Sequence, residues 1–157
     1  MAKAGFRIID SDAHVSEPPE IIEKYIDRKC LDRLLAWKLP GTKTYRPNQI
    51  GMRRKLGTVQ GPDDAKPQAQ VALAPRHRQA PKPDTNVNAV SRVSDMDLEG
   101  IDVDMILPTG VGSFCSVDDL ELEMEVIRAY HRFMSDYCRD HPHRLYGAAV
   151  VSARNIE

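Results

Sequence analysis

The chain has 157 residues, a formal net charge of -1, 41% hydrophobic and 29% charged residues. This balance is typical of a globular protein and excludes a disordered chain. No apolar run approaches the length of about 20 residues that crosses a bilayer, and the apolar stretch at the start is too short for a secretory signal, so we expect a cytoplasmic protein without membrane contact. Three widely spaced cysteines predict reduced thiols rather than a disulfide framework or a zinc knuckle.

The first predicted element is a buried strand over Phe6 to Asp10, short and rich in β-branched and apolar residues. A polar cluster follows it and ends at His14. Pro18 and Pro19 then punctuate the chain, and because proline fits the first turn of a helix, residues 20–25 are predicted to be helical.

Periodicity fades over residues 27–88, which hold seven of the eleven prolines and four of the nine glycines. Residues 38–83 contain ten Lys and Arg against two Asp, a local charge of +8. We interpret the segment as a basic insertion, either a solvated one, a lid that attracts a carboxylate substrate, or a surface for an acidic partner. Because no nucleic-acid motif accompanies the charge, polyanion binding is the weakest alternative and we expect no nucleic-acid partner.

Regular elements return after the insertion. Helical spacing predicts a helix over Val90 to Leu98, which Gly100 ends, and an apolar run predicts a strand over Val103 to Leu107. A long helix is expected from about Asp119 to His141, with Tyr130 and Tyr137 in the core, and a third strand over residues 145–151. Strands that alternate with helices predict parallel strands with helical crossovers. Three strands leave both sheet edges bare, so we expect the rest of the fold to come from further polypeptide.

Asp12 and His14 are the candidate metal ligands. Residues two apart in a strand point to the same side, so a carboxylate and an imidazole can face one divalent cation, the ligand types that suit zinc, iron or manganese. A hydrogen-bonded Asp-His pair or a loop cap explains the same spacing. Asp10 is predicted to face the same side as Asp12 and to give structural support. Glu17 is a candidate to orient the imidazole, with helix entry beside Pro18 as the alternative.

Three further histidines and Cys115 receive structural interpretations. His131, His141 and His143 fall in the long helix and its exit turn, where surface or capping roles are expected. Cys115 follows the second predicted strand, but no nearby base marks it as a nucleophile.

The string from Ile8 to Pro18, IIDSDAHVSEP, closely resembles the opening of the amidohydrolase-related family that includes aminocarboxymuconate-semialdehyde decarboxylase. Residues 95–102 and 106–109 are similar to that family's first helix and second strand, and residues 129–151 to its second helix and third strand. The resemblance implies an α/β fold, the first three strands of a (β/α)8 barrel whose complete form needs about 250 residues.

The resemblance also implies a mononuclear divalent metal, zinc first and manganese or iron as alternatives, with Asp12 and His14 as its first-strand ligands. A histidine and an aspartate of the fifth and eighth strands, and a general base, would come from a missing part of the barrel, a second polypeptide or a homo-oligomer. Hydrolysis or decarboxylation of a small-molecule carboxylate or amide is the implied activity. The alternative is a non-catalytic subunit that binds a partner through its open strand edges and basic insertion.

Overall fold

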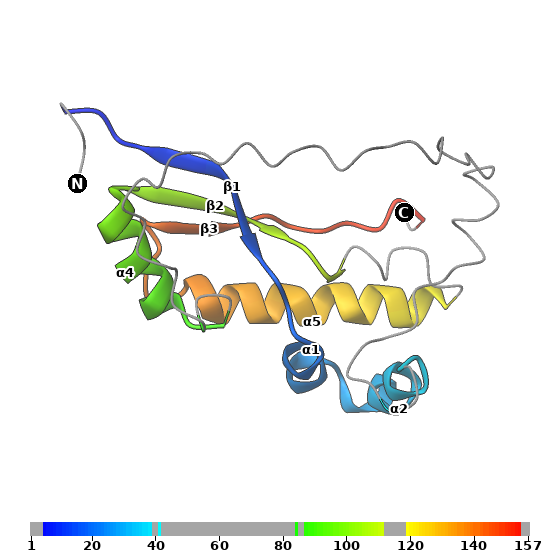
Figure 1. The fold of residues 1–157 in the computed structure, drawn as a ribbon. Coiled ribbons are helices and arrows are strands. Elements are labelled where there is room, and N and C mark those ends of the chain that lie inside the picture. Colours follow the sequence, from blue (N-terminus) through cyan, green and yellow to red (C-terminus); the bar gives the residue numbers. More distant parts are fainter. Residues whose placement is uncertain (1–4, 39–40, 42–83, 85–86, 112–118, 155–157) are drawn as a thin grey trace, which may run out of the picture.

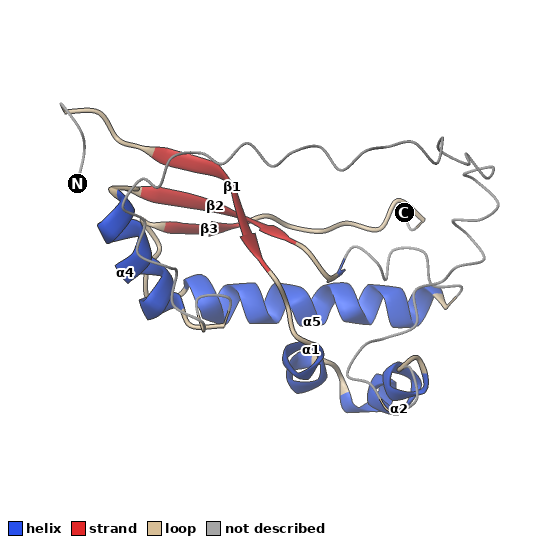
Figure 2. Ribbon diagram, in the orientation of Figure 1, coloured by secondary structure: helices blue, strands red, loops and turns tan. Residues whose placement is uncertain are grey.

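A parallel sheet with helices against one face organises the chain (Figures 1 and 2). The computed structural model describes residues 5–38, 41, 84, 87–111 and 119–154. In these, the strands follow the order β1 (Ile9–Val15), β2 (Val103–Pro108) and β3 (Leu145–Gly147). Because each connection returns the chain to a parallel neighbour, the three carboxyl ends of the strands meet at one edge of the sheet.

Side-chain caps and one glycine set the bounds of the helices. Helix α4 (Ala89–Glu99) begins at Asn88, whose side chain accepts from the next backbone N–H groups, and ends at Gly100 with φ 78°. Helix α5 (Leu120–Cys138) begins at Asp119, whose side chain accepts from the Leu122 N–H. The predicted helices and the second strand are therefore confirmed, with α5 ending slightly earlier than expected.

The core lies between the sheet and α5. Val15, Ile106 and Leu145 from the three strands are buried against the apolar face of α5, where Tyr130 and Tyr137 are buried as predicted. Burial of this size is the main favourable term in folding. Helix α1 (Pro19–Tyr25) packs on the far side of α5, and α2 (Arg28–Ala36) follows it there (Figure 1).

The strand bounds differ from the prediction at both outer strands. Strand β1 begins at Ile9 and runs through the polar cluster, whereas the sequence predicted a strand over residues 6–10. The reason is a register shift between Asp10 and Ala13, where the Asp10 carboxylate accepts from the Asp12 backbone N–H at 2.9 Å and stabilises a bulge. Strand β3 ends at Gly147 rather than Val151.

Residues 28–36 form a helix, although the sequence predicted an irregular segment from residue 27 onward. Asp27 caps this helix by accepting from the Lys29 N–H, and Cys30 and Leu34, four residues apart, are buried on one face. The basic part of the predicted insertion, apart from Lys38, lies outside the described residues.

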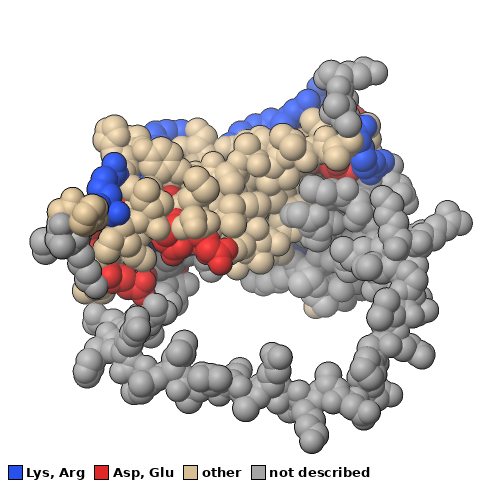
Figure 3. All heavy atoms as spheres, turned by 90° about the horizontal axis from the view of Figure 1, so that it is seen from above, with Lys and Arg blue, Asp and Glu red and all other residues tan. Residues whose placement is uncertain are grey.

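The face of the sheet opposite α5 is open among the described residues. Ile9, Met105 and Tyr146 are 61%, 46% and 48% exposed, and the strand register puts them on that face. Viewed from above, this side has a broad stretch without charged side chains (Figure 3). Within the described part of the chain, no helix has the length and hydropathy of a membrane span.

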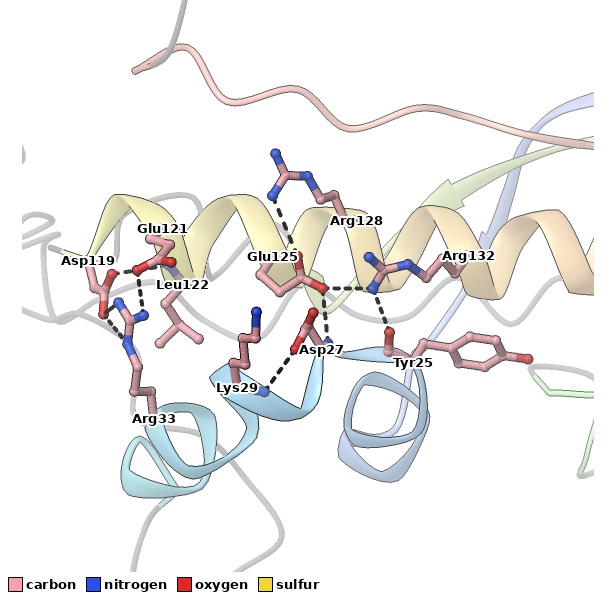
Figure 4. A network of polar contacts seen from close by, with 10 residues as sticks. All are labelled: Tyr25, Asp27, Lys29, Arg33, Asp119, Glu121, Leu122, Glu125, Arg128 and Arg132. Carbon is pink, nitrogen blue, oxygen red and sulfur yellow. Dashed lines mark hydrogen bonds and ion pairs between the residues drawn. The ribbon is translucent and has the colours of Figure 1, made fainter.

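Charged side chains fix α1 and α2 to α5 (Figure 4). Arg33 of α2 donates to the Asp119 carboxylate and, at 2.7 Å, to Glu121. Buried Glu125 accepts from the Asp27 backbone N–H at 3.0 Å and from Arg132 at 2.7 Å. Asp119 therefore holds the start of α5 in two ways, as a cap and as an ion pair.

Replacing Asp119 separates these two roles. Asp119→Asn keeps a good cap and loses the charge, while Asp119→Ala should cost about 1 kcal/mol more in unfolding free energy because the cap is lost as well. Burial raises the pKa of Asp119, but Arg33 and the Leu122 N–H outweigh it and hold that pKa below its ordinary value. The charge therefore stabilises the fold above about pH 4, the unfolded value, and this contribution is lost as pH falls through the lower folded pKa.

Urea denaturation of the three proteins at several pH values measures this. We expect the advantage of the wild type over Asp119→Asn to shrink at acid pH. An advantage that stays constant with pH would contradict the ion-pair role.

Candidate metal site

The candidate site lies where β1 and β2 end. His14 pairs with Leu107 in the strand register, and the Thr109 backbone N–H donates to the Val15 carbonyl at 3.1 Å just beyond. Carboxyl ends of parallel strands are where barrel enzymes carry their catalytic residues. Strand pairing alone therefore brings His14 beside Thr109, although 95 residues separate them in the chain.

Asp12 and His14 point toward each other. Asp12 Oδ1 lies 3.4 Å from His14 Nε2, and the side chains are 85% and 48% exposed. Two ligands with bond lengths of about 2.0–2.2 Å have this separation in a tetrahedral shell. The carboxylate oxygen and the imidazole nitrogen thus fit two positions around one divalent cation. As a simple ion pair at this exposure, the same two groups contribute little to stability.

Thr109 supports the other side of the imidazole. Its Oγ1 lies 3.1 Å from His14 Nδ1. A hydroxyl can donate or accept, so it satisfies Nδ1 in either tautomer. In the tautomer with the proton on Nδ1, this N–H donates a hydrogen bond to Thr109 Oγ1. Nε2 then keeps its lone pair on the side of Asp12, and this neutral tautomer can bind a metal through Nε2.

Arg92 of α4 holds the backbone of His14 from the interior. Its guanidinium donates to the His14 carbonyl at 2.6 Å, to Asp104 of β2 at 3.1 Å and to the Tyr137 hydroxyl at 2.9 Å. Arg92 and Asp104 are only 7% and 3% exposed. Burial raises the pKa of Asp104, with Arg92 opposing the shift. Burial lowers the pKa of Arg92, but its contacts with Tyr137 and Asp104 outweigh this and the net shift is upward, so the guanidinium stays charged.

Glu17 joins the two strand ends. Its Oε2 accepts from the Gly110 backbone N–H at 2.6 Å, and its Oε1 is buried without a hydrogen-bond partner among the described residues. A Cβ at Gly110 would lie 3.0 Å from Oε2, so the small residue lets the carboxylate approach. The contact found for Glu17 is thus with Gly110, and its expected role in orienting His14 stays a prediction.

Asp10 lies on the other face of β1 from Asp12, which corrects the predicted placement on the same side. The extra residue in the bulge reverses the alternation, so that Asp10 and Ala13 line one small cavity against α4 with Arg92 and Asp104. In a regular strand, where side chains alternate between the two faces, Asp10 and Asp12 would have been on the same face.

The other histidines that the structure describes form no metal-binding group with this pair. His131 of α5 accepts from the Val150 backbone N–H at 3.1 Å, which fixes the chain after β3, and His143 is exposed at the opposite end of the sheet. His141 is in the exit turn of α5, with its backbone N–H bonded to the Cys138 carbonyl. Cys115 lies outside the described residues. No group of three or more His, Cys, Asp or Glu that could hold a metal occurs in the described ranges.

Sequence reasoning missed Arg92 and Thr109. A signal for Arg92 was present, because it falls on the same helical face as Met96, four residues later, and Asp104 interrupts an otherwise apolar strand. Two opposite charges at positions predicted to be buried indicate a pair. Thr109 had no comparable signal, since its contact with His14 depends on the pairing of distant strands.

Comparison with known proteins gives the fold. No protein-family model matches the chain. No curated protein matches it either. The structure is similar to that of an amidohydrolase from Mycobacterium avium subsp. paratuberculosis K-10, with a TM-score of 0.59, 18% sequence identity and 95% of this chain covered. The match spans 43% of that amidohydrolase. The described sheet and helices therefore have the fold of part of a (β/α)8 barrel.

Glu17→Ala tests the contact with Gly110. Loss of a charge-assisted hydrogen bond should lower the unfolding free energy by about 1.5–3 kcal/mol and speed hydrogen exchange of the Gly110 amide. Glu17→Gln, which keeps an acceptor, should give a smaller change. Amide exchange followed by NMR measures both. If Glu17→Ala instead shifts the ring resonances of His14 and leaves Gly110 protected, the orienting role is favoured and the contact with Gly110 is not.

Proposed function

We propose that this chain provides the first two ligands, Asp12 and His14, of a divalent-metal-dependent hydrolase or decarboxylase that acts on a small-molecule carboxylate or amide. The observation that carries the proposal is the 3.4 Å separation of Asp12 Oδ1 and His14 Nε2 near the carboxyl end of β1. In barrel enzymes, this end of the strands carries the catalytic residues. The structural likeness to an amidohydrolase is consistent with it.

Carboxylate and neutral imidazole suit zinc, manganese and iron. Zinc is the first candidate because the resemblance of residues 8–18 to the amidohydrolase-related family implies it, with manganese or iron as alternatives. A cation bound there would supply a Lewis acid that activates water or polarises a substrate oxygen. Three residues of this chain would hold and support the cation's ligands: Asp12 offers an exposed carboxylate, Thr109 makes a hydrogen bond with Nδ1 of His14, and Glu17 connects the two strand ends.

Two ligands do not make a catalytic site, which typically has three or more from the protein. We propose that further polypeptide, either a partner chain or additional barrel sequence, provides the remaining ligands and the general base. Two observations support this: the structure matches 43% of the amidohydrolase, and the face of the described sheet opposite α5 exposes Ile9, Met105 and Tyr146.

The metal proposal predicts that Mn²⁺ broadens the NMR signals of Asp12 and His14 first. This paramagnetic effect detects weak binding, which is what two ligands provide. His14→Ala and Asp12→Asn should each remove the selective broadening. Asp140→Asn and His143→Ala remove the same residue types from exposed positions at the other end of the sheet and should leave it unchanged. Broadening that survives in His14→Ala would refute the assignment.

The open face predicts association, either with a partner or between copies of the chain. Met105→Lys puts a charge on that face and should lower the fraction that sediments above the monomer mass. Leu98→Lys is the matched control, because Leu98 is 62% exposed on α4, on the opposite side of the sheet. Equal sedimentation of the two variants would contradict association through the open face, and a wild type that is purely monomeric at high concentration would exclude self-association.

A further inference from the structure

We propose that Arg92 is the positioning residue of the candidate site: its hydrogen bond to the His14 carbonyl sets the position of the imidazole relative to Asp12. The inference rests on the proposed function for its consequence, metal affinity, but its structural claim concerns His14 alone. Arg92 touches no ligand atom of the site. It acts through the backbone of the residue that carries the imidazole.

The guanidinium is fixed from three directions. One terminal nitrogen donates to Asp104 at 3.1 Å, the Nε donates to Tyr137 at 2.9 Å, and the other terminal nitrogen donates to the His14 carbonyl at 2.6 Å. These acceptors belong to β2, α5 and β1. A planar group bonded to three elements cannot shift toward one without losing another, so it transmits the geometry of the core to the His14 carbonyl.

The bulge in β1 interrupts the strand pairing just before His14, so a further contact is needed to fix the backbone there. The register between β1 and β2 is interrupted between Asp10 and Ala13, and Asp12 lies inside the interruption. A bulge leaves its extra residue outside the ladder and bends the strand. Regular pairing resumes at Ala13 and continues to the pair Val15 and Pro108. Arg92 binds the carbonyl of His14, which lies one residue after the point where pairing resumes.

Burial of the pair argues for placement over simple stability. Taking a guanidinium and a carboxylate out of water costs more than an apolar pair of similar size would, so such pairs are weak evidence for stabilisation. Asp104 also leaves one oxygen buried and without a hydrogen-bond partner among the described residues. The arginine fork is what an apolar residue cannot replace, because only a donor can fix the His14 carbonyl.

Arg92→Lys tests the inference because it keeps the charge beside Asp104 and loses the fork. The matched control is Arg144→Lys. Arg144 also bridges separate segments, donating to the Asp102 carbonyl at 2.7 Å and to Asp97 at 2.8 Å, but at the opposite end of the sheet. A purely structural role would make the two variants behave alike.

The readouts are the His14 ring resonances without metal and the apparent Mn²⁺ affinity with it. In Arg92→Lys we expect shifted ring resonances and an affinity about tenfold weaker, the lower end of what loss of an outer contact costs a metal site. Arg144→Lys should change neither. Tyr137→Phe, which removes one anchor of Arg92 and keeps all charges, should give smaller changes in the same direction and replaces Arg92→Lys if that variant does not fold.

Unchanged ring resonances in folded Arg92→Lys, or equal shifts in Arg144→Lys, would overturn the inference. If the wild type does not bind Mn²⁺ selectively, the proposed function fails, yet the metal-free resonances still decide whether Arg92 positions His14. The two failures are thereby distinguishable.

Discussion

The buried ion pair between Arg92 and Asp104 is the interaction on which the arrangement of this structure depends. It lies between α4 and the sheet. The Arg92 guanidinium also donates to the Tyr137 hydroxyl and to the His14 carbonyl. Dehydrating two charges costs several kcal/mol per ion, and only good geometry with further hydrogen bonds offsets this. The present placement of α4 against β1 and β2 supplies these hydrogen bonds, and a displaced α4 would lose them. Apolar packing makes the fold stable, and the pair adds a geometric constraint to that packing.

The two faces of the sheet have different roles. The face toward α5 holds the apolar core and the buried polar network, while the other carries exposed apolar side chains and Asp12. The bulge is what turns Asp12 away from Asp10, because one extra residue reverses the alternation of the strand. A regular strand would have put both aspartates on one face. A local irregularity thus separates a carboxylate facing the core from one that is available for binding.

Local signals made α4, β2 and α5 predictable from sequence. Their apolar spacing, the caps at Asn88 and Asp119 and the glycine at residue 100 act within a few residues of chain. The bounds of β1 were missed because the bulge depends on a side-chain to backbone hydrogen bond that periodicity does not record. Helix α2 was missed because its nine residues border a stretch whose composition indicates irregular structure. Within the site, the Asp12 and His14 spacing was visible, whereas Thr109 and Arg92 reach His14 only through tertiary pairing.

Completion of the sheet and completion of the site are, on the proposed function, a single event. Parallel strands have all their carboxyl ends at one edge, so parallel strands added beside β1 or β3 would end at the same edge of the sheet as the strand that carries Asp12 and His14. Polypeptide that covered Ile9, Met105 and Tyr146 would at once remove apolar surface from water and add ligands to the cation. The free energy of covering the face then contributes to metal affinity, because the ligands come pre-placed. Arg92 matters in the same way, since it has already fixed the His14 backbone before any other ligand arrives.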